Sequence, residues 1–124
     1  MDFSNTQTIY MQIVEWVFEQ ILRDKWVTDE RVPSVRESAV HFEVNPNTVM
    51  RAYDYLQNQE IILNKRGIGF FVAPNAKEII LGIRKKHFLE EELPIFYKNL
   101  DLLNISMDEI VTLYHEYQQK NSEQ

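Results

Sequence analysis

The stretch PSVRESAVHFEVNPNTVMRAYDYLQNQEIILNKRGIGFFV, from Pro33 to Val72, decides the fold of this chain. Near its beginning, Ser34 is followed by Glu37 at the spacing of a capping box. In such a box the serine hydroxyl and the glutamate carboxylate each bind a backbone N–H that has no partner at a helix start. A helix is therefore predicted to begin at about Val35.

A second helix start follows at Asn45 and Pro46. Asparagine can accept a hydrogen bond from an amide of the first turn, and proline at the first helical position gives up an N–H that has no partner there. Only residues 41–44 separate the two helices, so a tight turn must join them. The pattern predicts a helix-turn-helix.

The second of these helices has one apolar and one polar side. Its apolar positions recur at steps of three and four, and they predict one buried stripe of Val49, Ala52, Tyr53 and Leu56. The opposite side then carries Asn47, Thr48 and Arg51. Amide, hydroxyl and guanidinium groups near a helix N-terminus suit hydrogen bonding to base edges, with Asn matched to adenine and Arg to guanine.

Two short apolar runs, 61–63 and 70–72, flank the segment NKRGIG and predict a β-hairpin. The two glycines allow positive φ angles, and Lys65 and Arg66 place adjacent cations at the tip. A basic hairpin tip by itself is most often a solvated turn. Directly after a helix-turn-helix it favours a wing that contacts the DNA backbone or minor groove. The expected fold class is mainly α with a small β-hairpin, an N-terminal winged helix-turn-helix with a short helical tail.

The blocks PSVRESA, NPNTVMRAYDYL and IILNKRGIGFFV resemble the winged-helix domain of the GntR family of bacterial transcription regulators. The resemblance covers roughly residues 8–74, and NPNTV combined with a short helical tail is similar to the YtrA-like subgroup. Two positions depart from the family pattern, because Ser38 stands where Leu is usual and Glu60 where Gly is usual. We expect Ser38 to thin the core contact of its helix and Glu60 to make the turn into the wing less permissive.

The resemblance also implies a set of DNA contacts. The arginine of the PSxR block contacts DNA in this family, and here that residue is Arg36. Further contacts are implied in the second helix and at the hairpin tip. With the serine cap and both tip cations included, the candidate DNA-binding residues are Ser34, Arg36, Asn45, Asn47, Thr48, Arg51, Lys65, Arg66 and Gly67.

The overall charge argues at first sight against nucleic-acid binding. The 124 residues carry a formal net charge of −6, whereas neutralisation of phosphates by Lys and Arg dominates affinity for DNA. The acidic excess lies elsewhere, because residues 31–72 contain five Lys or Arg and four Asp or Glu. One copy still offers few phosphate contacts. Useful affinity is therefore expected to need two copies, with their second helices about 34–36 Å apart.

Composition sets further bounds. An apolar content of 44% is enough for one or two small domains. The absence of cysteine excludes a disulfide scaffold and a cysteine-based zinc site. No apolar run approaches the length of a membrane span, so a soluble, cytoplasmic protein without a membrane partner is expected.

Helices are also predicted on both sides of the central stretch. Apolar periodicity predicts a first helix over about residues 8–26. Beyond the hairpin, helix-start signals at Asn75 and at Ser106 predict a helical tail, within which Pro94 should kink or break the chain near Glu92. The expected domains are a winged helix-turn-helix, residues 1–74, and a helical dimerisation tail, residues 75–124.

The tail carries an apolar seam with steps of four and three, and its last helix has an apolar side as well. Such a seam can pack inside a single chain. A tail of about 50 residues, however, cannot bury two apolar stripes by itself. The expected homodimer interface therefore consists of Leu89, Leu93, Phe96, Leu100, Leu103, Leu113 and Tyr117.

Signals of catalysis are weak. The sequence has no phosphate-binding loop, nucleophile elbow or HExxH pattern, so no catalytic residue, metal or cofactor is predicted. His87 and Glu91 have helical i, i+4 spacing, but two ligands are too few for a metal site and a solvated pair is favoured. The residues name no small-molecule effector, and any inducer is expected to use a groove between tail helices or the dimer seam.

The sequence thus predicts a sequence-specific DNA-binding transcription regulator, not an enzyme, that acts as a homodimer on a double-stranded DNA operator. Similarity to the YtrA-like subgroup favours repression. The alternative is a winged helix that serves as a protein-interaction or dimerisation module without DNA binding. Retention of the DNA-facing set Arg36, Asn47, Thr48, Arg51 and Arg66 favours the regulator.

Overall fold

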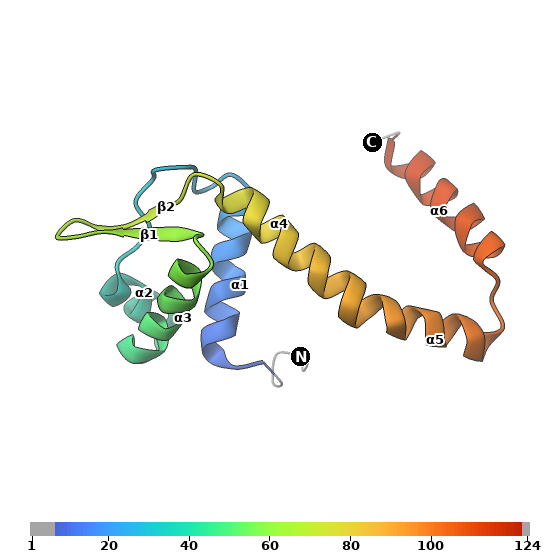
Figure 1. The fold of residues 1–124 in the computed structure, drawn as a ribbon, viewed down its shortest axis with the longest axis horizontal. Helices are drawn as coiled ribbons and strands as arrows, with labels where there is room; N and C mark the ends of the chain where they lie inside the picture. The colour runs from blue at the N-terminus through green and yellow to red at the C-terminus, as the bar shows by residue number, and fades with distance from the viewer. Residues whose placement is uncertain (1–6, 123–124) are drawn as a thin grey trace. The chain divides into compact units, whose positions relative to one another are not determined.

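The computed structural model describes residues 7–122 and divides the chain into two compact units, Met1–Ile83 and Arg84–Gln124. The first unit contains α1 (Ile9–Leu22), α2 (Val35–Phe42), α3 (Pro46–Asn58), β1 (Ile62–Lys65), β2 (Gly69–Val72) and most of α4 (Ala76–His87). The second contains the π-helical turn η2 (Phe88–Glu92), α5 (Leu93–Leu103) and α6 (Met107–Ser122). The predicted fold class, mainly α with one β-hairpin, is confirmed (Figure 1).

The core of the first unit is built around α3, which packs against both α1 and α2. The stripe predicted from the spacing of α3 is buried, with Val49, Ala52, Tyr53 and Leu56 each at most 1% exposed. Helix α1 contributes Ile13, Val14, Val17, Phe18 and Ile21 to the same core. The two helices therefore bury facing apolar stripes, as amphipathic helices of a small domain must.

The boundary between the units lies later in the chain than the 74/75 division expected from the sequence. Helix α4 begins at Ala76, and its residues Ala76 and Ile80 belong to the core of the first unit. The first turns of α4 are thus part of the winged-helix unit. A helix-start signal marks where a helix begins, but it does not say against which core that helix packs.

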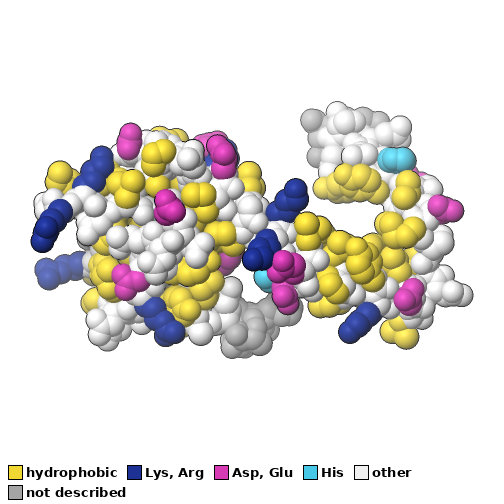
Figure 2. Space-filling model, viewed as in Figure 1, with side chains coloured by type: hydrophobic (Ala, Val, Ile, Leu, Met, Phe, Trp, Pro, Cys, Tyr) yellow, Lys and Arg dark blue, Asp and Glu magenta, His cyan; other side chains and the backbone are white. Residues whose placement is uncertain are grey.

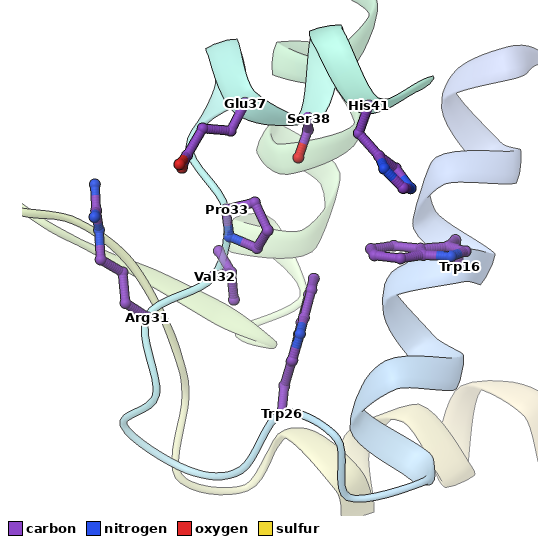
Figure 3. Close-up of a pocket in the computed structure, with 8 residues that line it drawn as sticks. All are labelled: Trp16, Trp26, Arg31, Val32, Pro33, Glu37, Ser38 and His41. Atoms are coloured by element: carbon purple, nitrogen blue, oxygen red, sulfur yellow. The ribbon is translucent and has the colours of Figure 1, made fainter. Parts of the chain in front are cut away.

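The first helix is shorter than the predicted range 8–26, since α1 ends at Leu22. Asp24 adopts a left-handed conformation with a φ of 60°, which stops the helix. The chain then turns back and brings Trp26 edge-to-face against Trp16, with ring centroids 5.3 Å apart. Figure 3 shows the planes of the two indole rings turned steeply against each other. The apolar side chain of Trp26 serves this contact and does not continue the apolar face of α1. Apolar periodicity alone therefore predicts a helix that is too long.

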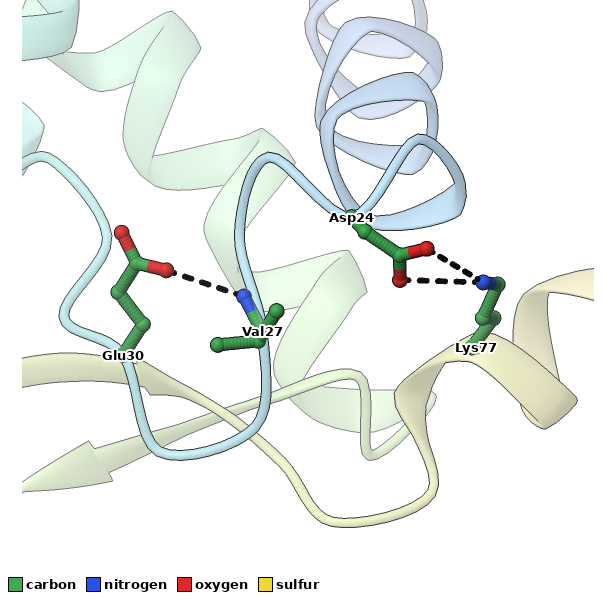
Figure 4. A network of polar contacts seen from close by, with 4 residues as sticks. All are labelled: Asp24, Val27, Glu30 and Lys77. Carbon is green, nitrogen blue, oxygen red and sulfur yellow. Dashed lines mark hydrogen bonds and ion pairs between the residues drawn. The ribbon is translucent and has the colours of Figure 1, made fainter.

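Polar contacts hold the loop that follows α1. The carboxylate of Asp24 accepts two hydrogen bonds from Lys77 Nζ, each 3.1 Å long, and Glu30 Oε1 accepts one from the N–H of Val27 at 3.1 Å (Figure 4). The Lys77 and Asp24 side chains are 48% and 67% exposed, so their ion pair contributes at most about 1 kcal/mol. Its main effect is to tie the loop to the start of α4.

The hairpin is paired on both sides of β2. Strands β1 and β2 run antiparallel with Ile62 opposite Val72, and the segment before α2 adds to the other edge through a bridge between Arg31 and Phe71. At Gly69, a Cβ would come within 2.8 Å of Arg31 Nε. Glycine at this position therefore lets the arginine side chain cross the hairpin closely.

Tyr53 connects α3 to α2 and to the residue before α2. Its hydroxyl donates a hydrogen bond of 2.6 Å to the carbonyl of Pro33 and lies 2.9 Å from Ser38 Oγ. Its ring lies edge-to-face against Phe70 of the hairpin, with centroids 5.1 Å apart. Burial raises the pKa of Tyr53, so the hydroxyl remains a donor. Ser38, which was expected only to thin the packing of α2, is thus a buried hydrogen-bonding partner.

The turn into the wing carries the second departure from the family pattern. Glu60 has a φ of 62°, in the left-handed region that glycine adopts more easily. Its N–H donates to the carbonyl of Gln57 at 2.9 Å, which closes the turn after α3. Glu60 therefore occupies at this turn a backbone conformation that glycine would adopt with less strain.

In the second unit, Pro94 interrupts the regular helix without ending it. Residues 88–92 form the π-helical turn η2, in which the N–H of Leu93 bonds to the carbonyl of Phe88. Proline at position 94 cannot donate to the carbonyl of Glu90, and a wider turn accommodates that loss. The interruption predicted near Glu92 is therefore present as a π turn.

The last helix begins where its serine cap predicted. Ser106 Oγ accepts a hydrogen bond of 3.1 Å from the N–H of Glu109, and α6 starts at Met107. Helix α6 has no buried residue, and Leu100 is the buried residue of α5. Across residues 7–122, no helix combines the length and the apolar content that crossing a lipid bilayer requires.

We expect Tyr53→Phe to lower the free energy of unfolding by about 1–3 kcal/mol, because it leaves Ser38 and the Pro33 carbonyl without their partner. Urea denaturation followed by circular dichroism measures this change. Tyr97→Phe is the control, since it removes the same hydroxyl from a ring that is 52% exposed. Equal stability losses in the two variants would show that the buried hydroxyl has no special role.

Candidate nucleic-acid interface

The start of α2 is fixed by the capping box that the sequence predicted. Ser34 Oγ accepts a hydrogen bond from the N–H of Glu37 at 3.0 Å, and Glu37 Oε1 accepts one from the N–H of Ser34 at 2.8 Å. Arg36 lies in the first turn and is exposed. The box therefore holds the backbone rigidly around Arg36, and its guanidinium extends into solvent.

The carboxylate of Glu37 is stabilised in its charged form. Its pKa lies below the ordinary value of 4.5, mainly because the backbone N–H of Ser34 bonds to it. The Ser34 side chain and the positive charge of Arg31 lower the pKa further. At neutral pH the Glu37 carboxylate is therefore ionised, and the capping box keeps both of its hydrogen bonds.

Helix α3 presents the polar face that the sequence assigned to base edges. Asn45 caps the helix, and its Oδ1 accepts a hydrogen bond of 2.7 Å from the N–H of Asn47. Asn47 and Arg51 are exposed and Thr48 is half-buried, whereas Val49 on the adjacent face is fully buried. One helix thus anchors itself in the core and leaves its N-terminal polar groups free to meet a ligand.

Arg51 lies over an aromatic ring that is not among the candidate residues predicted from the sequence. Its Cζ lies 4.2 Å from the centroid of the Tyr10 ring on α1. A cation over an exposed aromatic face gains about 0.5–1 kcal/mol and leaves the N–H edge of the guanidinium available. No local spacing could link Tyr10 to Arg51, because they lie on different helices.

The hairpin tip is a tight turn that carries two cations. The N–H of Ile68 donates to the carbonyl of Lys65 at 2.8 Å, and Gly67 in the third position of the turn has a φ of 79°. A turn of this kind requires a residue that tolerates positive φ at that position. Lys65 Nζ lies 4.3 Å from the centroid of the Phe71 ring, and Arg66 is exposed. The predicted roles of Gly67 and of the tip cations are thus compatible with the geometry.

The first unit contains all nine candidate DNA-binding residues. Seven of them are exposed, and Ser34 and Thr48 are half-buried. Figure 1 shows the hairpin projecting away from α1, and Figure 2 shows Lys and Arg side chains protruding at this end of the unit. Arg31 lies against the hairpin as well, a position that its sequence context does not predict.

His87 makes a different contact from the one its spacing suggested. His87 Nδ1 lies 3.4 Å from Glu92 Oε2, and not next to Glu91 as expected for an i, i+4 pair. The π turn adds one residue per turn, so the i+5 position moves to where i+4 would lie in an α-helix. Both side chains are more than half exposed, in keeping with a solvated pair.

Known proteins resemble this chain along most of its length. Residues 9–72 match the gntR family of bacterial regulatory proteins, a range that includes all nine candidate positions. The HTH-type transcriptional repressor YtrA of Bacillus subtilis (strain 168) is 36% identical over 93 residues, which cover 75% of this chain and 71% of YtrA.

Solved structures are similar as well. The crystal structure of a GntR-family transcriptional regulator from Bacteroides thetaiotaomicron has a TM-score of 0.82 and 49% identity, covering 92% of this chain and 99% of that one. The DNA-binding domain of AraR, crystallised in complex with operator ORR3, has a TM-score of 0.50 and 30% identity, covering 52% of this chain and 77% of that one.

The capping box should make stability depend on pH in the acidic range. Because the folded-state pKa of Glu37 is lowered, its stabilisation is present above its ordinary pKa of 4.5 and is lost as the pH falls through the folded value. We therefore expect the free energy of unfolding of wild type to exceed that of Glu37→Gln at pH 7. The gap between the two free energies should narrow towards pH 3. Chemical denaturation at a series of pH values measures it.

The matched control for this prediction is Glu43→Gln, which removes one exposed carboxylate from the other end of the same helix. Its stability difference from wild type should not narrow in the same way. A constant difference between wild type and Glu37→Gln across the acidic range would contradict the assigned role of the carboxylate.

Proposed function

The chain belongs to the GntR family of bacterial regulatory proteins and is a transcriptional regulator with a DNA-binding winged helix, and we propose that it acts as a homodimeric repressor on an operator. The promoter of its own operon is the first DNA to test. The proposal places the protein in the cytoplasm, where operator DNA is accessible. It assigns no catalysis to the chain.

The observation that carries the DNA-binding part is the division of α3 into two faces. Its apolar stripe is completely buried, whereas Asn47 and Arg51 remain exposed at the N-terminal half of the same helix. A helix anchored in this way can enter the major groove without disturbing the core. Arg36 at the start of α2 and Arg66 at the hairpin tip supply further exposed cations for backbone or groove contacts.

The homodimer part rests on the apolar surface of the second unit. Of the seven seam residues predicted from the sequence, only Leu100 is buried, and Leu93 and Phe96 are half-buried. Leu103 and Tyr117 are 63% and 62% exposed. Large apolar side chains exposed together mark interaction surfaces. A second copy is the occupant we propose, because one winged helix with a small positive excess needs a partner to bind DNA usefully.

Dimerisation would give the operator its form. Two copies related by a two-fold axis would place two α3 helices in successive major grooves, about 34–36 Å apart. The operator is then expected to be an imperfect palindrome with half-sites separated by one helical turn. The similarity to the repressor YtrA supports repression as the direction of control.

Substitution of Arg36 should weaken operator binding. Arg36→Ala is expected to reduce affinity about tenfold or more, since each lost base contact costs about 1–3 kcal/mol. Electrophoretic mobility shift over a salt series measures both the affinity and its salt dependence. If Arg36 contacts phosphate, the salt slope should also fall by about one unit.

Arg23→Ala is the matched control for Arg36→Ala. Arg23 is an exposed arginine at the C-terminal end of α1, where it pairs with Glu19, and it is not among the candidate DNA contacts. Its affinity should equal that of wild type. Unchanged binding by Arg36→Ala, or no protected site in the promoter, would favour the alternative of an interaction module without DNA binding.

The tail seam should control the oligomeric state. We expect Leu103→Lys to convert a dimer into a monomer of 14.9 kDa, because a charge in an apolar interface loses its hydration. Sedimentation velocity measures this change. Loss of the second binding unit should then lower operator affinity about a hundredfold or more.

Val40→Lys serves as the control for the tail substitution, since Val40 is 74% exposed but lies in the first unit. It should leave the sedimentation coefficient unchanged. A wild-type protein that sediments as a monomer at micromolar concentration would refute the dimer proposal while leaving DNA binding to be judged by Arg36→Ala.

A further inference from the structure

The winged-helix unit contains an open cleft that the proposed function does not use. The cleft has a volume of about 570 Å³ and lies between α1, the loop after α1 and α2. Trp16, Trp26, Val32, Pro33, Ser38 and His41 form its walls (Figure 3). This volume falls within the range of about 300–1,000 Å³ that is usual for small-molecule sites.

Aromatic groups dominate one side of the cleft. Trp16 and Trp26 meet edge-to-face at an interplanar angle of 76°, and the His41 ring lies 5.5 Å from Trp16. Both indoles are only partly buried, and both line the cleft. Aromatic walls set at an angle favour a planar aromatic guest, which can stack on one ring and present its edge to the other.

The roof of the cleft carries a polar atom with a defined hydrogen-bonding role. Tyr53 donates its single hydroxyl hydrogen to the Pro33 carbonyl at 2.6 Å. The contact of 2.9 Å between Ser38 Oγ and Tyr53 Oη must therefore be donated by Ser38. The serine hydrogen is used in this way, so its oxygen can act towards a guest only as an acceptor.

The space itself depends on the size of residue 38. Ser38 is 3% exposed, and it lines the cleft at a position where the family pattern usually has leucine. Leucine has a larger side chain than serine, so a leucine at this wall is expected to leave less space in the cleft. Serine therefore both enlarges the hollow and introduces the acceptor.

The opposite side of the cleft carries one charge of each sign. Arg31 and Glu37 line that side, away from Trp16 (Figure 3). Their charges offset each other, so the mouth has no strong preference for a cationic or an anionic guest. A neutral or zwitterionic molecule fits this arrangement best.

We propose that this cleft binds a planar aromatic small molecule of one or two rings that carries an N–H or O–H donor directed at Ser38 Oγ. The site lies in the winged-helix unit, whereas the sequence placed any effector groove in the tail or at the dimer seam. The proposal goes beyond the proposed function and does not depend on it, because binding to the cleft is measured without DNA.

The chain offers a specific reporter for this site. It contains two tryptophans, and both line the cleft, so the two indole N–H signals in a ¹H–¹⁵N correlation spectrum report on it directly. Indole is the probe, and 1-methylindole is its matched partner without the N–H donor. We expect saturable shifts of both signals with indole. Affinity for 1-methylindole should be about 3- to 10-fold weaker, as expected for one lost hydrogen bond.

Two substitutions at position 38 separate space from hydrogen bonding. Ser38→Leu should abolish the saturable shifts because it fills the hollow, and a wild-type-like circular dichroism spectrum confirms that it folds. Ser38→Ala leaves the hollow open, so it should bind both probes with equal affinity. Because that comparison uses two probes on one protein, it holds even if Ser38→Leu fails to fold.

The proposal is overturned if indole produces no saturable shift at low millimolar concentration. It is also overturned if folded Ser38→Leu binds indole as tightly as wild type does, or if wild type binds 1-methylindole as tightly as indole. None of these results bears on operator binding, so failure here and failure of the proposed function are distinguishable.

Discussion

The hydroxyl of Tyr53 is the contact on which the winged-helix unit depends. It accepts from Ser38 of α2 and donates to the carbonyl of Pro33, while the ring packs against Phe70 of the hairpin. One buried side chain of α3 thereby determines how α2, the segment before it and β2 are placed around that helix. Because a buried polar group without a partner is costly, this arrangement excludes small shifts of the helices that would break either hydrogen bond.

The polar face of α3 stays exposed while the opposite face of the same helix is fixed in the core. Helix α3 uses its apolar residues and Tyr53 for the core, and it leaves Asn47 and Arg51 in solvent. Aromatic rings support the cations of the same surface, with Tyr10 beneath Arg51 and Phe71 beside Lys65. Such support limits the number of positions that a long side chain can adopt, and less entropy is then lost when it binds.

The tail follows a different physical rule. Its helices bury little of their own apolar surface, and α6 has no buried residue. The π turn before Pro94 also changes which side chains share a face of the helix. The contact of His87 with Glu92 is a direct result of that turn. Apolar side chains exposed together in this way are typical of interaction surfaces, and the second copy that we propose would cover them.

The sequence by itself determined what depends on neighbouring residues. The capping box at Ser34, the start at Asn45 and Pro46, the buried stripe of α3 and the glycine turn of the wing all have the form predicted. Each is encoded by residues within a few positions of one another, so short-range hydrogen bonding and periodicity suffice to predict it.

Only the tertiary structure decided what depends on residues far apart in the chain. The end of α1 before Trp26, the docking of α4 on the first core, the bridge from Arg31 to β2 and the support of Arg51 by Tyr10 all belong to this group. The cleft beneath Ser38 belongs to it too, since three separate segments line it. Packing between distant segments selects one partner among many, and the spacing of residues within a segment carries no record of that choice.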